Sequence, residues 1–311
     1  MAPRLKTFPP LQYVASGGFL HTRHRGVMYP PFMNLDTIEQ LEAVWSAGHN
    51  DILICTHQKV GTHLTKRFVV EILRRAQAHL SSCIYRSGDI GHGTVPWPEV
   101  LASQHGMDAF QHHLESTKEQ ARLWYTHTRI EHMPFHRIDP GARFLVVGRD
   151  PRSVAVSQFF FYKSHPLLEV PKDLGLDDFV EMFLGGDLYF GDYFSHLSDW
   201  SAARHPNILP SQILTLSYED LVQDKARMVR KITAFLLPNF ELCDTQVSDI
   251  VAATEFDRMK SDISKNPQSF HFNPDTFFRA GTVSDWERHL SPETATAILE
   301  KMGRPAWDAA S

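Results

Sequence analysis

The sequence predicts an α/β fold with a central, mostly parallel sheet flanked by helices. Short apolar segments at 52–55, 143–149 and 212–217 alternate with longer amphipathic segments, as strands and helices do in a parallel sheet. Polar residues follow each apolar segment, and ligands of such sheets bind beyond the carboxyl ends of the strands. A length of 311 residues suits one large domain. The fold class therefore predicts a ligand site at one edge of the sheet.

Composition argues against several classes of protein. Apolar residues make up 42% and charged residues 22% of the chain, which is ordinary for a globular domain. The net charge of −5 argues against a nucleic-acid binder, because such proteins carry a basic surface. No apolar segment is long enough for a membrane span, no signal peptide is recognisable, and three scattered cysteines match no zinc pattern. We expect a cytoplasmic protein, and the sequence leaves open whether it forms a homodimer.

The N-terminal region differs from the rest of the chain. Residues 1–35 contain three Pro-Pro or Gly-Gly pairs and predict an irregular arm that forms part of the acceptor side, ahead of a single domain over 36–311. Asn34 or Asp36 is expected to cap a helix that runs to about Ala47. One face of that helix is expected to be apolar, through Leu41, Val44 and Trp45.

The strand at 52–55 is followed by a loop and a second helix. This helix is expected from Thr62 to about His79. Its apolar residues recur at helical spacing and predict a buried stripe, made of Leu64, Phe68, Ile72 and Leu73. Glycine and proline predict a loop over 81–100.

The remaining elements continue the alternation. A helix is expected near 106–120, and residues 122–126 predict a strand that ends at His127. The run 143–149 is continuously apolar, as in a central strand covered on both faces, and Asp150-Pro151 is a good helix start. The expected order ends with a broken helix at 177–204, a strand at 212–217 and a helix from Tyr218 to about Leu237.

The loop after the first strand carries an unusual lysine. It places Lys59 and a row of backbone N–H groups at a helix N-terminus, where anions bind readily. A Walker loop has its lysine after the last glycine and before Ser or Thr. Here Lys59 precedes Gly61 and Thr62 follows it. The inverted order indicates that the transferred group is not phosphoryl.

Four polar residues follow predicted strand ends: Lys59, His127, Arg149 and Tyr218. Because the carboxyl ends of parallel strands meet at one edge, these side chains are expected to lie together. Arg149 and Ser157 can bind one phosphate through guanidinium, hydroxyl and amide groups. The alternative interpretation is an ion pair at a strand end and a helix surface position.

Five segments between about residues 50 and 290 share the order and spacing of one family's motifs: Thr56-His-Gln-Lys-Val-Gly-Thr62, Arg122-Leu-Trp-Tyr-Thr-His127, 143–157, Leu216-Ser-Tyr-Glu-Asp-Leu221 and Phe278-Arg-Ala-Gly-Thr-Val-Ser-Asp-Trp286. Together they resemble the motifs of cytosolic-type sulfotransferases, which use 3′-phosphoadenosine 5′-phosphosulfate (PAPS). The resemblance implies a P-loop-like sulfotransferase fold. It also implies transfer of a sulfuryl group to a hydroxyl or amine of a small molecule.

The resemblance also assigns residues to the donor. The 5′-phosphosulfate would be held by Lys59, Val60, Gly61, Thr62 and His63, and Leu64 would occupy the position of the family's adenine-stacking Trp. The 3′-phosphate would be held by Arg149, Ser157 and the segment Phe278, Arg279, Ala280 and Gly281. Tyr218, Thr254 and Phe256 would border the adenine, although an aromatic residue packed in the core is the alternative for Phe256.

The implied chemistry needs two residues in catalytic roles. His127 would accept a proton from the acceptor as it attacks sulfur, because imidazole titrates near neutrality. Lys59 would neutralise charge on the oxygen that leaves with adenosine 3′,5′-bisphosphate (PAP). The expected transfer is direct and in line, without a covalent intermediate. No metal is expected, because no spacing of His, Cys and Asp resembles a metal site.

The chain departs from the family's motifs at several positions. Val60, His63 and Leu64 replace Ser, Thr and Trp of the loop, Tyr125 and Ala280 each replace a Lys, and Ser284 replaces a Gly. The lost cations predict a weaker electrostatic hold on PAPS. We hypothesise that the His63 side chain replaces the missing threonine contact to the phosphosulfate.

The acceptor side is less defined. Aromatic residues at 159–162 together with Tyr189, Phe190 and Tyr193 are candidates to line it, with burial inside helices as the alternative. The arm at 17–33, with Trp97 and Pro98, could close over the acceptor. The sequence does not decide whether the acceptor is a phenol, an alcohol, a sugar or an amine. Two rival functions also remain, an ATP-dependent phosphotransferase and a non-catalytic PAPS- or nucleotide-binding protein of the same fold.

Overall fold

A computed structural model describes residues 21–76, 95–117, 122–133, 137–168, 170–265, 278–279, 281 and 283–302. Its central sheet has the order β4-β3-β5-β6, formed by β3 (Ile52–Thr56), β4 (Leu123–Thr126), β5 (Arg143–Gly148) and β6 (Ile213–Ser217). All three pairings are parallel. The predicted α/β fold with a parallel central sheet is therefore confirmed.

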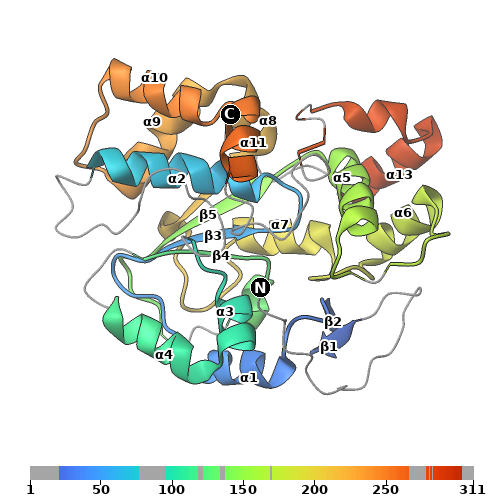
Figure 1. The fold of residues 1–311 in the computed structure, drawn as a ribbon, viewed down its shortest axis with the longest axis horizontal. Coiled ribbons are helices and arrows are strands. Elements are labelled where there is room, and N and C mark those ends of the chain that lie inside the picture. The colour runs from blue at the N-terminus through green and yellow to red at the C-terminus, as the bar shows by residue number, and fades with distance from the viewer. Residues whose placement is uncertain are drawn as a thin grey trace.

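Helices enclose this sheet (Figure 1). They are α1 (Leu35–Val44), α2 (Thr62–Ala76), α3 (Pro98–His105), α4 (Met107–Ser116), α5 (Pro151–Ser164), α6 (Leu176–Gly185), α7 (Tyr193–Ser201), α8 (Tyr218–Gln223), α9 (Lys225–Leu236), α10 (Asp244–Ala253), α11 (Phe256–Lys265) and α13 (Pro292–Met302). Short 3₁₀ turns lie at Ile130–His132 (η1), Pro210–Gln212 (η2) and Asp285–Arg288 (η4). In Figure 1, α2, α9 and α10 lie above the strands, and α1, α3 and α4 lie below them.

The central strands are apolar because they have no solvent face. Every residue of β3 is buried, and so is all of β5 except its first residue. Parallel strands covered on both faces lose the polar alternation of half-exposed strands. The core consequently continues from the sheet, where Trp124 is fully buried, to Phe68 on α2, Trp200 on α7 and Trp45 just beyond α1, which are also fully buried.

Several sequence-based expectations about the elements need correction. The described part of the arm contains an antiparallel hairpin, β1 (Thr22–His24) and β2 (Val27–Tyr29), rather than irregular chain only. Helix α3 occupies part of the expected loop at 81–100, because Pro98 starts a helix as well as ending a loop. The expected helix from Tyr218 to Leu237 is interrupted at Asp224, whose side chain caps α9.

The first two helices also differ in detail. Asn34 caps α1 as expected, but the helix ends at Val44, which is exposed, and Trp45 is buried just beyond it. In α2, Phe68, Ile72 and Leu73 are buried as predicted, whereas Leu64 is only partly buried and packs against both the main core and a second, smaller apolar cluster. Residues 77–79, expected to end this helix, lie outside the described residues.

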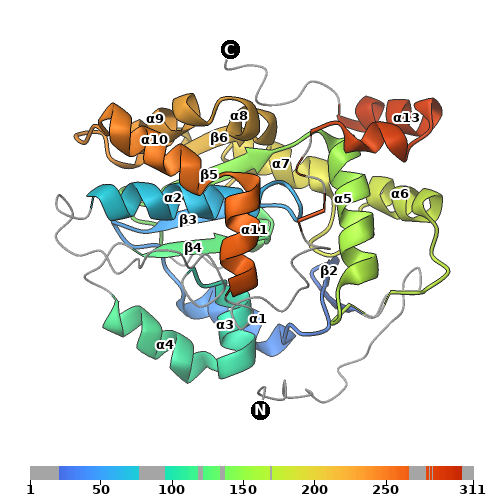
Figure 2. The same ribbon diagram turned by 45° about the horizontal axis from the view of Figure 1, so that its top comes forward.

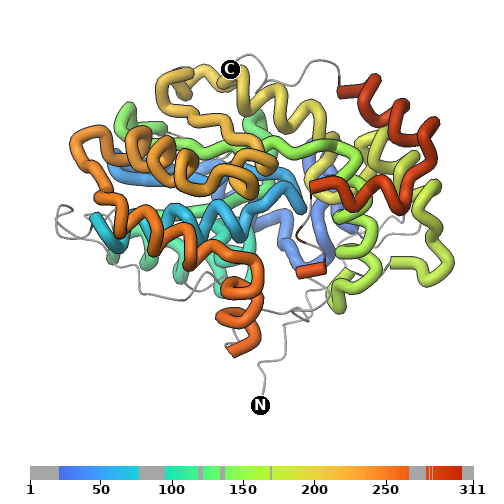
Figure 3. The backbone as a smooth tube through the Cα atoms, turned by 90° about the horizontal axis from the view of Figure 1, so that it is seen from above, coloured from blue at the N-terminus to red at the C-terminus, as the bar shows by residue number. Residues whose placement is uncertain are grey.

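The fold brings several helix ends to the carboxyl edge of the sheet. Helix α2 begins six residues after β3, and α5 begins three residues after β5. Figure 2 shows α5 beyond the ends of the strands, with α11 beside α2, and Figure 3 shows α5, α6 and α13 together on that side. Among the described residues, no helix is long and apolar enough to cross a membrane.

Candidate active site

A pocket of about 250 Å³ lies at this edge of the sheet. Its cationic half is formed by the loop 58–64, the first turns of α5 and the residues around Tyr218, Phe256 and Arg279. Its apolar half is formed by Phe32, Trp97, Val100, Phe161, Leu167 and Leu168, together with Tyr125, His127, Gln104 and His165. The two halves meet where the Lys59 ammonium lies 4.6 Å from the centre of the Phe161 ring.

The loop between β3 and α2 has a strained and closely packed backbone. Lys59 has a φ of 67° and Gly61 a φ of 105°, and the left-handed region costs a non-glycine residue on the order of 1–3 kcal/mol. A Cβ at Gly61 would lie 2.6 Å from Cδ2 of Tyr218, so only glycine fits there. A 2.9 Å contact between the hydroxyls of Thr56 and Thr62 ties the strand to the start of α2. The loop is thus held in one conformation.

Three cations converge on the cationic half: Lys59, Arg149 and Arg279. Burial, followed by the charges of Arg149 and Arg279, lowers the pKa of Lys59 to about 7. Such a shift means that the buried Lys59 ammonium lies near the charges of Arg149, which is partly buried, and Arg279, which is exposed. An anionic ligand between them would relieve this repulsion. The cationic half therefore has the electrostatics of an anion site.

Arg149 is fixed at both its backbone and its side chain. The Tyr193 hydroxyl accepts a hydrogen bond from the Arg149 N–H at 3.0 Å and donates one to the Arg149 carbonyl at 2.5 Å. Nη1 of Arg149 donates to the Lys59 carbonyl at 2.8 Å, and its guanidinium carbon lies 4.3 Å from the Tyr218 ring centre. The lysine loop and the end of β5 are joined through this one side chain.

Arg279 and helix α5 complete the cationic half. Arg279 forms an ion pair with Asp285 and lies 4.4 Å from the Phe160 ring centre. Ser153, one turn before Ser157, donates a 2.7 Å hydrogen bond to the Val283 carbonyl. The segment around 279–285 is thereby joined to the helix that begins at the end of β5.

His127 lies in the apolar half, at the end of β4. Its Nδ1 lies 2.6 Å from the Thr56 carbonyl oxygen, which can only accept, so Nδ1 carries the hydrogen and Nε2 has the free lone pair of the neutral ring. Burial lowers the pKa of His127 to about 3. The Trp97 and Phe190 rings contact it, with centroids 4.9 and 5.3 Å away. The His127 ring is therefore neutral with one nitrogen available, as a general base requires. Its pKa nevertheless lies well below the near-neutral value expected from the sequence, because the ring is buried.

A polar network beneath the loop was not predicted from the sequence. His57 contacts the Gly191 carbonyl through Nε2 at 3.2 Å and accepts from the Gln158 amide at Nδ1, at 2.9 Å. The Tyr162 hydroxyl donates to Gln58 at 2.7 Å. These contacts attach the lysine loop to α5. His57 and Gln58 lie within the segment Thr56-His-Gln-Lys-Val-Gly-Thr62, but no sequence signal marked them as part of such a network.

Fourteen of the sixteen residues that the sequence singled out line this one pocket: Lys59, Gly61, Thr62, His63, Leu64, His127, Arg149, Ser157, Tyr218, Thr254, Phe256, Phe278, Arg279 and Gly281. Val60 does not, because its side chain is fully buried in the core, which leaves only its backbone for a ligand. Ala280 lies outside the described residues.

Only some of the residues expected on the acceptor side line the pocket. Of the aromatic run at 159–162, only Phe161 lines the pocket. Tyr189, Phe190 and Tyr193 are buried in the core, which favours the alternative of burial inside the fold. Phe32 and Trp97 do line the pocket, as the closing-arm hypothesis requires.

Other pocket residues were missed. Val100 and Gln104 lie on α3, a helix that was not predicted, and Lys225 begins α9, where it pairs with Glu255 at 2.8 Å. No local motif marks these positions. In the described residues, no group of three or more His, Cys, Asp and Glu side chains could hold a metal ion.

Comparisons with known proteins agree with the site's chemistry. A family model described as a sulfotransferase domain matches residues 49–304. Sulfotransferase 2A1 of Macaca fascicularis is 27% identical over 278 residues, covering 88% of this chain and 90% of that protein. Sulfotransferase 1A1 of Rattus norvegicus is 29% identical over 259 residues, covering 78% of this chain and 80% of that protein.

Solved structures share the fold. The mouse sulfotransferase SULT7A1, complexed with PAP, aligns with a TM-score of 0.66 and 23% identity, over 90% of this chain and 92% of that chain. Retinol dehydratase, in complex with androsterone and inactive cofactor PAP, aligns with a TM-score of 0.68 and 19% identity, over 91% and 88%.

Proposed function

The chain belongs to the sulfotransferase family, and we propose that it transfers the sulfuryl group of PAPS to a hydroxyl or amine of a small molecule. The family model covers residues 49–304, which include both halves of the pocket apart from Phe32. The observation that carries the proposal is that one pocket holds both a three-cation anion site and a neutral His127 whose Nδ1 is bonded to the Thr56 carbonyl.

The cationic half fits a donor with phosphate groups on both the 3′ and the 5′ oxygen of its ribose. Lys59 and the N-terminus of α2 offer one set of anion-binding groups. Arg149, Ser157 and Arg279 offer a second set, near the N-terminus of α5. Tyr218, Thr254 and Phe256 lie in the same half and provide flat or apolar surface for a base. PAP-bound relatives support this assignment of donor.

Two residues of this chain would act on the reacting groups. His127 would accept the acceptor's proton at Nε2, and its Nδ1–H bond to the Thr56 carbonyl would hold the ring in that orientation. Lys59 would neutralise the negative charge that develops on the departing phosphate oxygen. PAPS supplies the sulfuryl group and carries its own leaving group.

The apolar half supports a small acceptor with an apolar body. Its wall is mostly aromatic and aliphatic, and Gln104 and His165 add two polar groups. We also propose that the enzyme acts in the cytoplasm, a proposal supported by the resemblance of its motifs to cytosolic-type sulfotransferases. Neither the identity of the acceptor nor the choice between O- and N-sulfation enters this proposal.

Calorimetry with PAP, followed by turnover of ³⁵S-labelled PAPS against a panel of phenols, alcohols, sugars and amines, tests the function. The expected result is PAP binding and transfer of label to at least one acceptor. Binding of PAP without transfer to any member of the panel would favour the non-catalytic rival. ATP turnover that requires magnesium, without PAP binding, would favour the phosphotransferase.

A further inference from the structure

Glu99 is a buried carboxylate that the proposed chemistry does not use. It lies in the first turn of α3, two residues after Trp97, and is only 2% exposed. Burial raises the pKa of Glu99, and hydrogen bonds from the hydroxyls of Thr126 and Thr128 oppose that shift. A carboxylate removed from water costs several kcal/mol unless its oxygens are well satisfied. The burial of the Glu99 carboxylate therefore needs an explanation.

The contacts of Glu99 converge on the residues either side of His127. Its Oε1 accepts hydrogen bonds from the hydroxyls of both Thr126 and Thr128, the latter at 2.5 Å. The Thr126 hydroxyl in turn accepts from the backbone N–H of Thr128 at 3.0 Å. One carboxylate oxygen thus links the residue before His127 to the residue after it.

Two further contacts fix the same segment. The Trp200 indole donates to the Thr128 carbonyl at 3.2 Å, so both backbone polar groups of Thr128 are held. The Trp97 ring, on the segment that leads into α3, meets the His127 ring edge-on, with centroids 4.9 Å apart. Glu99 therefore connects the backbone of His127 with a wall of the apolar half.

We propose that Glu99 is a positioning residue that holds His127 in its reactive orientation through the hydroxyls of Thr126 and Thr128. It acts through the backbone of 126–128 and does not contact the reacting atoms. The proposal rests on the proposed function for its kinetic consequence. Its structural consequence, an ordered 126–128 segment, does not depend on any activity.

The kinetic test compares three substitutions. Glu99→Leu removes the acceptor oxygen and is expected to lower kcat at least about tenfold, since small misplacements of a catalytic group are costly. PAP affinity should stay within about twofold, because the cationic half is untouched. Glu99→Gln keeps an acceptor oxygen and should retain most of kcat. Thr128→Val removes one of the two hydroxyl contacts, and its kcat should lie between those of Glu99→Leu and Glu99→Gln.

A double-mutant cycle separates positioning from general stability. In a His127→Ala background, Glu99→Leu should cause little further loss of kcat, because there is no imidazole left to position. Full additivity of the two losses would contradict the proposal. Glu71→Gln is the matched control, because Glu71 is equally buried, on α2, and pairs with Arg74 and Arg75. It should lower the melting temperature without changing kcat.

Amide hydrogen exchange gives a readout that needs no turnover. Exchange at Thr128 N–H should accelerate at least about tenfold in Glu99→Leu and less in Thr128→Val, with the exchange of β3 unchanged. If Glu99→Leu does not fold, the Thr128→Val variant alone decides. Unchanged exchange and unchanged kcat in a folded variant would overturn the proposal. A wild-type enzyme that sulfates nothing would count against the proposed function, while the exchange result would still test Glu99.

Discussion

The two halves of the pocket are built in different ways. The cationic half takes its polar groups largely from three local units in which a strand, a turn and a helix follow one another: β3 to α2, β5 to α5 and β6 to α8. The apolar half collects residues from the segment after the β1–β2 hairpin, from α3 and the residue before it, from the end of β4, from α5 and from the residues that follow α5. Phe32 and His165, for example, stack with their rings 6.3 Å apart although they lie 133 positions apart in the sequence.

This difference matches the ligand that we propose for each half. Phosphate groups are recognised by backbone N–H groups and fixed cations, which a helix N-terminus supplies within a few residues. An apolar body is recognised by shape, which only side chains brought together by the whole fold can define. We therefore expect donor binding to be sensitive to charge, and acceptor choice to be sensitive to volume.

The largest effect is expected at the junction of the two halves. Lys59→Ala and His127→Ala should each reduce kcat at least about a hundredfold, because each removes a group that acts in the transition state. Turnover of labelled PAPS at saturating donor measures this. Each variant should retain its melting temperature within a few degrees, and a near-normal rate in either one would remove that residue from the mechanism.

The second effect is a pH dependence of PAP binding to the cationic half. The pKa of Lys59 is about 7 in the absence of ligand, and a bound phosphate should raise it. PAP should therefore bind the protonated form, so its affinity is full below pH 7 and falls up to about tenfold per unit above it. Calorimetry from pH 6.5 to 8.5, in buffers of different ionisation enthalpy, should detect proton uptake. A Lys59→Met variant that keeps the same uptake would show that another group titrates.

A smaller and more selective effect is expected in the apolar half. Val100→Trp fills space in the pocket wall on α3 and should raise the KM of a preferred acceptor about tenfold, with the PAP dissociation constant within about twofold. Val44→Trp, at an exposed position on α1, is the control and should change neither constant. An equal loss of donor affinity in Val100→Trp would contradict the division of the pocket into independent halves.

The smallest effect concerns the loop substitution at His63. The side chain lines the pocket where the family has a threonine. His63→Ala should weaken PAPS binding by about threefold to tenfold, which is the loss expected for one hydrogen bond of ordinary strength. Calorimetry with PAP and the inhibition constant of PAP measure it. His112→Ala, exposed on α4, is the control. No change in either constant would contradict the hypothesis.

The same comparison explains how far the sequence could predict the molecule. The strands and the residues around Lys59 and Arg149 could be predicted from the sequence. Their signals are local: apolar runs, a glycine and a helix that starts with proline. Helix α3 was missed because its proline also fits a loop, and with it Val100, Gln104 and the buried Glu99 were missed. Tyr193 looked like a pocket aromatic, but its ring lies in the core and its hydroxyl fixes the backbone of Arg149.

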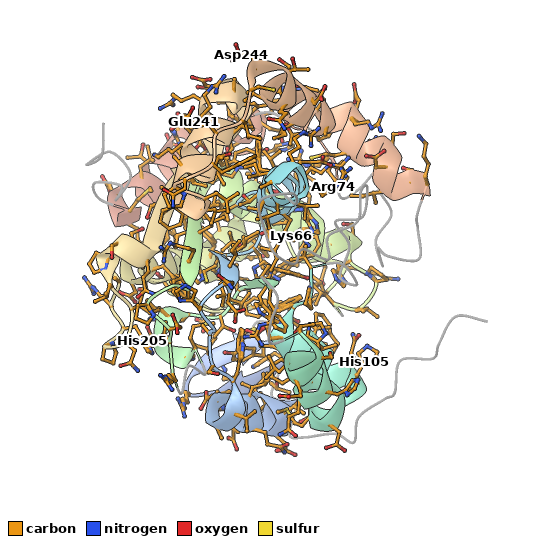
Figure 4. The ribbon with its side chains drawn as sticks, turned by 90° about the vertical axis from the view of Figure 1, so that its left-hand side faces the viewer. Lys66, Arg74, His105, His205, Glu241 and Asp244 are labelled. Atoms are coloured by element: carbon orange, nitrogen blue, oxygen red, sulfur yellow. The ribbon has the colours of Figure 1, made fainter. Side chains whose placement is uncertain are left out.

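The burial of Lys66 on α2 also could not be predicted from the sequence. Lys66 lies in the interior of the molecule, whereas Asp244 and His205 lie at its periphery (Figure 4). The Lys66 ammonium lies 4.0 Å from the centre of the Tyr125 ring. An amphipathic pattern assigns lysine to a solvent face, so no sequence argument would have placed this cation beside the strand that ends at His127.

The most direct test of a two-part donor site is a crystal structure of the enzyme with PAP. The predicted result has the 5′-phosphate on the N–H groups of the Lys59 loop, the 3′-phosphate between Arg149, Ser157 and Arg279, and His127 facing the 5′-phosphate from the apolar half. PAP bound elsewhere, or bound with the two phosphates exchanged between these positions, would contradict the assignment of the donor site.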